Sequence, residues 1–174
     1  MRSLLNSVSR VTSVLATLAL WLSGIGLVAM TGIVGWQVYG RYVLNATPVW
    51  SEPITLQLMG WFILFGAAVG VRENFHLGLD LLHHVLPKAI GRIMDIVSLV
   101  LMVGFGAAMS WYSTQLVIGT WSATLPALGI PGGWDYMPLA IGGFLIALFA
   151  LERLAERLVG VEHAEVVPPV TEAV

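Results

Sequence analysis

The sequence contains no cysteine and few charges. Of its 174 residues, 10% are charged and 57% are hydrophobic. Without cysteine there is no disulfide framework, no thiolate metal site and no cysteine nucleophile. A soluble domain carries roughly 25% charged residues, so this shortage of charge is too large for an ordinary soluble core. The net charge of −2 comes without a basic patch, so nucleic acid is not an expected partner.

Charge is absent altogether from four stretches of the chain. Counted between charged residues, these stretches are 30, 19, 39 and 16 residues long. A helix needs about 20 apolar residues to cross a hydrocarbon core about 30 Å thick. We therefore predict an all-α integral membrane protein with one transmembrane domain over residues 1–155. Its four transmembrane helices are expected within Val11–Tyr39, Pro53–Val71, Ile93–Ile118 and Tyr136–Leu151.

Both ends of the chain differ from the predicted spans. The start, with Arg2 and Arg10, resembles the charged region of a signal peptide. The apolar stretch that follows is longer than a signal-peptide core of roughly 7–15 residues, so we interpret it as a retained first span. Residues 156–174 are polar and contain two prolines, and they predict a disordered cytoplasmic tail.

The distribution of Lys and Arg indicates an orientation. Seven of these residues fall in the two tails and in the loop between the second and third spans. One, Arg41, falls in the loops on the other side. Positively charged residues collect on the cytoplasmic side of membrane proteins. The sequence therefore predicts a multi-pass protein with both termini in the cytoplasm.

The loop between the second and third spans is rich in histidine. Its segment Arg72–Asp95 mixes leucines with His76, Asp80, His83 and His84. This mixture predicts a short amphipathic helix that lies in the membrane interface. Histidines can also bind a metal or haem, but the axial ligands of haem in a four-helix anchor lie inside facing spans. We therefore favour a polar interfacial face and predict no metal or cofactor site.

No predicted span contains an ionisable residue well inside it. Proton relays and ion sites usually need a buried carboxylate, histidine or arginine at membrane depth. The largest uncharged polar groups in the spans are Gln37, Gln57 and Gln115. Such residues more often bond helices together than bind a ligand. The chain therefore lacks the groups needed to move an ion alone. It also lacks a Ser/His, His/Glu or Asp/Asp pair at membrane depth, which an intramembrane enzyme would need for catalysis.

Two pairs of residues are candidates for contacts. Gly66 and Gly70 form a GxxxG pair, which lets helices approach closely. This pair could pack against another span or against another membrane subunit, and both alternatives stay open. Arg41 and Glu52 flank a short loop, where they could pair with each other or each reach the lipid headgroups.

Several of these residues occur in an order that resembles a known family. The set consists of Arg41-Tyr42, Trp50-Ser51-Glu52, Gly66-Ala67-Ala68, Arg72-x-x-x-His76-x-x-x-Asp80 and Leu86-Pro87. Over about residues 10–151 the chain resembles the small membrane subunit (DctQ-like) of tripartite ATP-independent periplasmic (TRAP) transporters. One departure is Pro53, because family members often carry a second acid directly after the position of Glu52.

The resemblance implies a non-catalytic small permease subunit in the bacterial inner membrane. In this family a periplasmic binding protein captures an organic anion, such as a C4-dicarboxylate, a keto acid or a sugar acid. A large membrane subunit then moves the anion with a sodium gradient, and the small subunit acts as its scaffold. We hypothesise that Arg41, Trp50 and Glu52 fix the outer edge where the binding protein docks. His76 and Asp80 are expected to form an inner structural contact.

Two other functions are alternatives. A haem- or quinone-associated membrane anchor would use the histidines as ligands. A self-sufficient small transporter would be expected to carry an acid inside a span. The transported substrate is not encoded in this chain, because other proteins of such a system bind it.

Overall fold

The computed structural model describes residues 2–73 and 88–159. The elements are α1 (Arg2–Tyr42), α2 (Ser51–Arg72), α4 (Lys88–Thr120), the short 3₁₀ helix η1 (Gly132–Tyr136) and α5 (Met137–Val159). Each long helix includes an apolar stretch long enough to cross a membrane. The described ranges contain no β-strand, so the predicted all-α architecture with four long apolar helices is confirmed.

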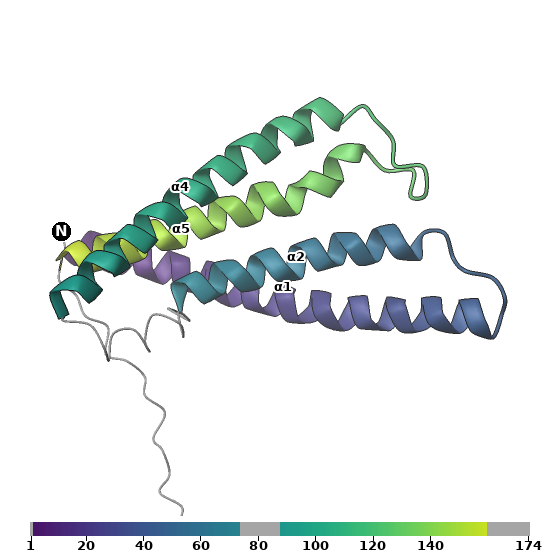
Figure 1. Cartoon of the computed structure of the whole chain (residues 1–174), viewed down its shortest axis with the longest axis horizontal. Coiled ribbons are helices and arrows are strands. Elements are labelled where there is room, and N and C mark those ends of the chain that lie inside the picture. The colour runs from purple at the N-terminus through teal and green to yellow at the C-terminus, as the bar shows by residue number, and fades with distance from the viewer. Residues whose placement is uncertain (1, 74–87, 160–174) are drawn as a thin grey trace, which may run out of the picture.

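The four helices form two hairpins, α1 with α2 and α4 with α5 (Figure 1). α2 packs against both α1 and α5, and α4 packs on α5. We call the end of the bundle that carries the two connections, residues 43–50 and 121–131, the hairpin end. The opposite end is called the terminal end. The two hairpins diverge toward the hairpin end and come together at the terminal end (Figure 1).

The helices are longer than the predicted spans. α1 has 41 residues, which gives a length of about 60 Å at 1.5 Å per residue. A bilayer with its headgroups is about 40–45 Å thick, so α1 tilts in the membrane or extends beyond it. α5 continues to Val159, past the end of the predicted fourth span at Leu151.

Two predicted segments lie outside the described residues. The predicted interfacial helix, with His76 and Asp80, falls within residues 74–87. Residues 160–174 make up most of the predicted tail. Three statements therefore stay predictions: the interfacial helix, the disordered tail and the division of the chain at residue 155.

Glycine brings the backbones of α4 and α5 into contact. A Cβ atom added to Gly106 would lie 2.8 Å from the backbone nitrogen of Ala147. One added to Gly143 would lie 2.8 Å from the backbone nitrogen of Ser110. Because backbone atoms cannot move aside as a side chain can, any larger residue at either position would push the helices apart.

The contact between α1 and α2 also depends on small residues. Ser23 Oγ donates a 2.8 Å hydrogen bond to the carbonyl oxygen of Phe62. A Cβ on Gly66 would lie 3.3 Å from that Oγ atom, and a Cβ on Gly26 would lie 3.5 Å from the Cβ of Phe62. Gly66 therefore leaves room for a hydroxyl that bonds the two helices together.

The core lies where α1, α2 and α5 meet, toward the terminal end. Phe149 of α5 is fully buried. The buried residues clustered with it are Ala16, Ala19, Phe65, Ala68, Val69, Val71, Leu145, Ile146 and Ala150. Large apolar side chains such as Val28 and Leu101 are exposed on the outside of the bundle. Exposed apolar surface on this scale fits a protein that is surrounded by lipid.

Candidate functional site

Polar and charged side chains gather at the terminal end and connect all four helices. α5 supplies three of them from its last turns, and each of the other helices supplies one. Thr12 Oγ1 of α1 donates a 2.6 Å hydrogen bond to Glu152 Oε1 of α5. We refer to the following residues as the terminal cluster: Thr12, Arg72, Asp95, Glu152, Arg153 and Arg157.

Arg72 and Glu152 face each other in the most enclosed part of the terminal cluster. Arg72 Nε lies 3.8 Å from Glu152 Oε2, and the two side chains are 19% and 7% exposed. Neither atom has a hydrogen-bond partner among the described residues. Burial costs both charges their hydration, so each depends on the other for compensation. Arg72 Nη1 also lies 3.4 Å from Oε1 of the half-exposed Glu73. The pair therefore fixes how α5 sits on α2.

Two arginines complete the terminal cluster. Arg153 Nε donates a 2.6 Å hydrogen bond to the carbonyl oxygen of Arg72, the last residue of α2. Carbonyl groups at a helix C-terminus lack partners within the helix and carry partial negative charge, so a guanidinium stabilises them. Arg157 lies 3.6 Å from Asp95 of α4, measured between Nη2 and Oδ2. Through these contacts α5 is bound to each of the other three helices.

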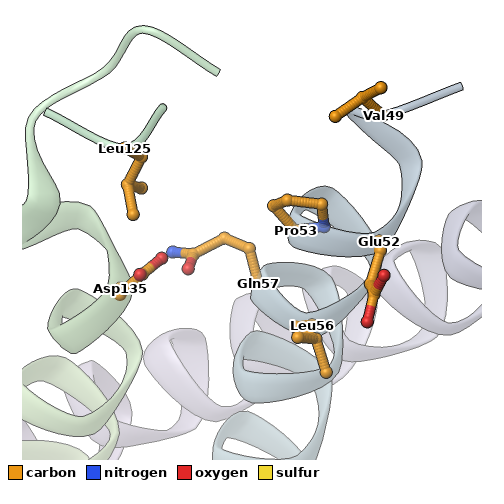
Figure 2. Close-up of a pocket in the computed structure, with 7 residues that line it drawn as sticks. All are labelled: Val49, Glu52, Pro53, Leu56, Gln57, Leu125 and Asp135. Carbon is orange, nitrogen blue, oxygen red and sulfur yellow. The ribbon is translucent and has the colours of Figure 1, made fainter. Parts of the chain in front are cut away.

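A cavity of about 530 Å³ opens between the two hairpins at the hairpin end (Figure 2). One side of it is the start of α2, and the other side is the connection between α4 and α5 with η1. Its lining consists of Val49, Glu52, Pro53, Leu56, Gln57, Leu125 and Asp135. Four of these residues are apolar, and the charged groups of the lining are two carboxylates.

One hydrogen bond joins the hairpins beside this cavity. Gln57 Nε2 of α2 donates to the carbonyl oxygen of Trp134 in η1 at 2.7 Å. η1 is held close to α4, since a Cβ on Gly133 would lie 2.6 Å from the carbonyl oxygen of Val117. Gln57 thus bonds two parts of the bundle together, as expected for a glutamine in a span.

The connection between α4 and α5 is closed by its own backbone hydrogen bonds. Leu125 N–H donates to the Ile130 carbonyl oxygen at 2.9 Å, and Gly132 N–H donates to the Ala123 carbonyl oxygen at 2.7 Å. Gly129 has a φ of +67°, a left-handed conformation that glycine adopts without strain. These contacts hold Leu125 in place at the wall of the cavity.

The structure places the candidate contact residues in different parts of the bundle. Arg41 is exposed near the end of α1, while Trp50 and Glu52 lie at the start of α2. Arg41 and Glu52 form no ion pair within the described ranges, and Glu52 lines the cavity instead. Gly66 lies in the contact between α1 and α2, whereas a Cβ on Gly70 would meet nothing within 4 Å.

The sequence did not predict the terminal cluster. Thr12 and Glu152 are 140 residues apart, so no local pattern relates them. One signal was present, because acid and base alternate in Glu152-Arg153 and Glu156-Arg157 directly after an apolar span. Such alternation is typical of a helix end bound by ion pairs. In the part of the chain that the structure describes, no group of three or more His, Cys, Asp or Glu side chains could hold a metal ion.

The fold and the charge distribution define an all-α membrane protein with four long apolar helices. Residues 30–160, about three quarters of the chain, match a family described as tripartite ATP-independent periplasmic transporters, DctQ component. The chain belongs to this family, which confirms the resemblance seen in the sequence. It is therefore a multi-pass inner-membrane transport subunit rather than an enzyme.

Individual relatives carry names from the same transporter system. The C4-dicarboxylate TRAP transporter small permease protein DctQ of Vibrio cholerae is 30% identical over 94 residues, which cover 54% of this chain and 38% of the relative. The sialic acid TRAP transporter small permease protein SiaQ of the same species is 26% identical over 72% of this chain and 73% of its own length. The aligned chain thus spans less than half of the first relative and about three quarters of the second.

A third relative is a much larger protein. The sialic acid TRAP transporter permease protein SiaT of Haemophilus influenzae is 29% identical over 75 residues. These residues are 43% of this chain but 12% of that permease. A segment similar to this chain therefore occurs inside a large permease.

Proposed function

We propose that this chain is a non-catalytic scaffold that holds a large transport subunit in the membrane during sodium-driven uptake of an organic anion. The observation that carries this proposal is the position of the charges. In the described helices charged side chains lie near the helix ends, and the central turns have none. A subunit that moved an ion itself would need ionisable groups at mid-membrane depth.

The internal bracing of the bundle supports a scaffold role. The terminal cluster binds α5 to α1, α2 and α4, and Gly106 and Gly143 bring two helices into backbone contact. Packed interiors of this kind resist deformation and transmit force between their elements. A bundle with fixed internal geometry suits a subunit that stays still while its partner moves.

The proposed partner is a large membrane subunit that contains the transport site. The SiaT relative supports this, because a segment similar to this chain forms part of a much larger permease. The names of other relatives mention C4-dicarboxylates and sialic acid. The proposed class of substrate is therefore an organic anion, such as a C4-dicarboxylate, a keto acid or a sugar acid, delivered by a periplasmic binding protein.

We further propose that the terminal end faces the cytoplasm. Basic residues of four helix ends gather there, whereas Arg41 is near the hairpin end. The excess of positive charge on the cytoplasmic side of membrane proteins supports this orientation. The hairpin end then faces the periplasm, and Arg41, Trp50 and Glu52 form the edge on which the binding protein docks.

Reconstitution into liposomes tests the scaffold function. This chain, the large subunit and the two together are each supplied with loaded binding protein and a sodium gradient. We expect uptake of labelled substrate only when both membrane subunits are present. Uptake by this chain alone, or full uptake by the large subunit alone, would contradict the proposal.

Substitutions at the hairpin end test the docking edge in the same liposomes. Arg41→Ala and Trp50→Ala are expected to raise the binding-protein concentration for half-maximal uptake about tenfold, as for one lost interface anchor. Gly70→Ala is the matched control, because a Cβ there meets nothing within 4 Å. Arg41 is not part of the cavity lining, so its effect reports on docking alone. If both variants need no more binding protein than the wild type, the docking edge lies elsewhere.

A further inference from the structure

The cavity at the hairpin end has the size and the lining of a binding site for an amphiphilic cation. Its volume of about 530 Å³ falls within the range of roughly 300–1,000 Å³ found for small-molecule sites. Figure 2 shows Glu52 and Leu56 on α2, with Leu125 and Asp135 on the facing hairpin. A ligand between the hairpins would thus meet apolar surface and carboxylates together.

The polar groups of this lining are hydrogen-bond acceptors. Glu52 and Asp135 form neither an ion pair nor a side-chain hydrogen bond in the described part of the chain. Gln57 Nε2 is engaged with the carbonyl oxygen of Trp134, which leaves the Oε1 oxygen as the free acceptor of this amide. Carboxylates accept hydrogen bonds and carry negative charge, so the complementary ligand is a cation with N–H donors.

The apolar wall continues from the cavity along α2. Leu56 lines the cavity and is 56% exposed. Met59 and Ile63 follow it at helical spacing, and they are 39% and 48% exposed. Residues three or four positions apart share one face of a helix, so these side chains form a strip that runs from the cavity toward the middle of the membrane. An acyl chain has the length and the chemistry to cover this strip.

We propose that the cavity binds a phospholipid with a primary-amine headgroup, such as phosphatidylethanolamine, from the leaflet at the hairpin end. The ammonium group donates hydrogen bonds to the carboxylates of the lining, and one acyl chain lies along the strip that begins at Leu56. A choline headgroup carries the same charge but has no N–H donor, so this site distinguishes the two lipids. The proposal goes beyond the scaffold function and does not depend on it.

Native mass spectrometry of the full chain tests this site. The protein is delipidated in detergent and titrated with dioleoylphosphatidylethanolamine or dioleoylphosphatidylcholine, which have the same acyl chains. We expect the ethanolamine lipid to bind about tenfold more tightly, as for one charge-assisted hydrogen bond. Equal binding of the two lipids would overturn the proposal.

Substitution of the carboxylates gives a second readout. The double variant Glu52→Gln/Asp135→Asn removes both charges with little change in shape, and we expect it to bind the two lipids equally. Glu73→Gln is the matched control, since it removes one carboxylate next to the opposite end of α2 and should keep the preference. Circular dichroism and elution volume confirm that each variant is folded. A preference that survives in the double variant would overturn the proposal.

A basic side chain of a partner protein is the competing occupant. In that case the purified chain would show no lipid preference, and the double variant would lose affinity for the binding protein. This combination would overturn the lipid site while leaving the scaffold function intact. Conversely, lipid binding is measured without transport, so a failed uptake experiment would not remove the lipid site.

Discussion

At the terminal end α5 is tied to each of the other helices by a polar contact, and two of these contacts are ion pairs, Glu152 with Arg72 and Arg157 with Asp95. At the hairpin end the described hairpins share the hydrogen bond from Gln57 to Trp134, and the carboxylates beside it are unpaired. The two ends therefore differ in how far the chain satisfies its own polar groups. The terminal end holds the bundle together, and the hairpin end retains polar groups for another molecule.

Breaking the terminal cluster is expected to have the largest effect on stability. Glu152→Ala removes the acceptor of Thr12 and the buried counter-charge of Arg72, which then keeps only the half-exposed Glu73 at 3.4 Å. Loss of one partner of a buried ion pair costs about 3–5 kcal/mol. Because Arg72 keeps Glu73, we expect the free energy of unfolding to fall by the lower value, about 3 kcal/mol. Unfolding in mixed micelles, followed by tryptophan fluorescence, measures the change.

The double variant Arg72→Met/Glu152→Leu is the control for this prediction. It removes both charges, so no uncompensated charge stays buried and most of the lost stability should return. A double variant as unstable as Glu152→Ala would show that the charges are not the cause.

Gly106→Ala on α4 is expected to have the next largest effect, and Gly104→Ala is its control. Gly106→Ala places a Cβ 2.8 Å from backbone atoms of α5, whereas Gly104→Ala meets nothing within 4 Å. Overpacking costs about 1–3 kcal/mol, so Gly106→Ala should lower the free energy of unfolding by that amount. Gly104→Ala should be neutral or slightly stabilising, because alanine favours a helix. Equal effects of the two substitutions would mean that α4 and α5 do not pack through Gly106.

The smallest effect is expected from Gln57→Ala, which removes the hydrogen bond to Trp134. Loss of one such bond costs about 1 kcal/mol. Because the natural chain has no cysteine, spin labels can be attached at single introduced cysteines such as Leu44→Cys and Ser122→Cys. We expect the distance distribution between these two labels to broaden in Gln57→Ala, since this hydrogen bond joins the hairpins there.

Labels at the terminal end provide the matched comparison for this experiment. Arg10→Cys and Leu158→Cys mark α1 and α5 at exposed positions of that end. Their distance distribution should be unchanged by Gln57→Ala, because the terminal cluster stays intact. Broadening at both ends would show that the two ends are not independent.

The helices could be predicted because the membrane imposes a simple rule on the sequence. A charge-free stretch of about 20 residues has few alternatives to a transmembrane helix, so four helices follow from where the charges are absent. The ends of the helices were less predictable. α5 continues past its apolar stretch, where Arg153 and Arg157 bind to neighbouring helices.

The contacts between helices could be predicted only in part. Gly66 belongs to a GxxxG pair, which indicates a close approach but not the identity of the other helix. The structure places Ser23 of α1 against Gly66, and leaves Gly70 open. The local pattern of Arg41 and Glu52 likewise did not reveal that Glu52 and Asp135 would line the same cavity. Such pairings depend on how whole helices pack, and a short sequence motif carries no information about that packing.

The hydrogen bond between Thr12 and Glu152 has a consequence for the biogenesis of the protein. Its partners are 140 residues apart, so the first hairpin leaves the ribosome long before Glu152 exists. Arg72 likewise cannot pair with the buried Glu152 until α5 has been synthesised. The terminal cluster can therefore be completed only after the end of α5 has been synthesised, and chains truncated before it lack the buried carboxylate of Glu152 beside Arg72.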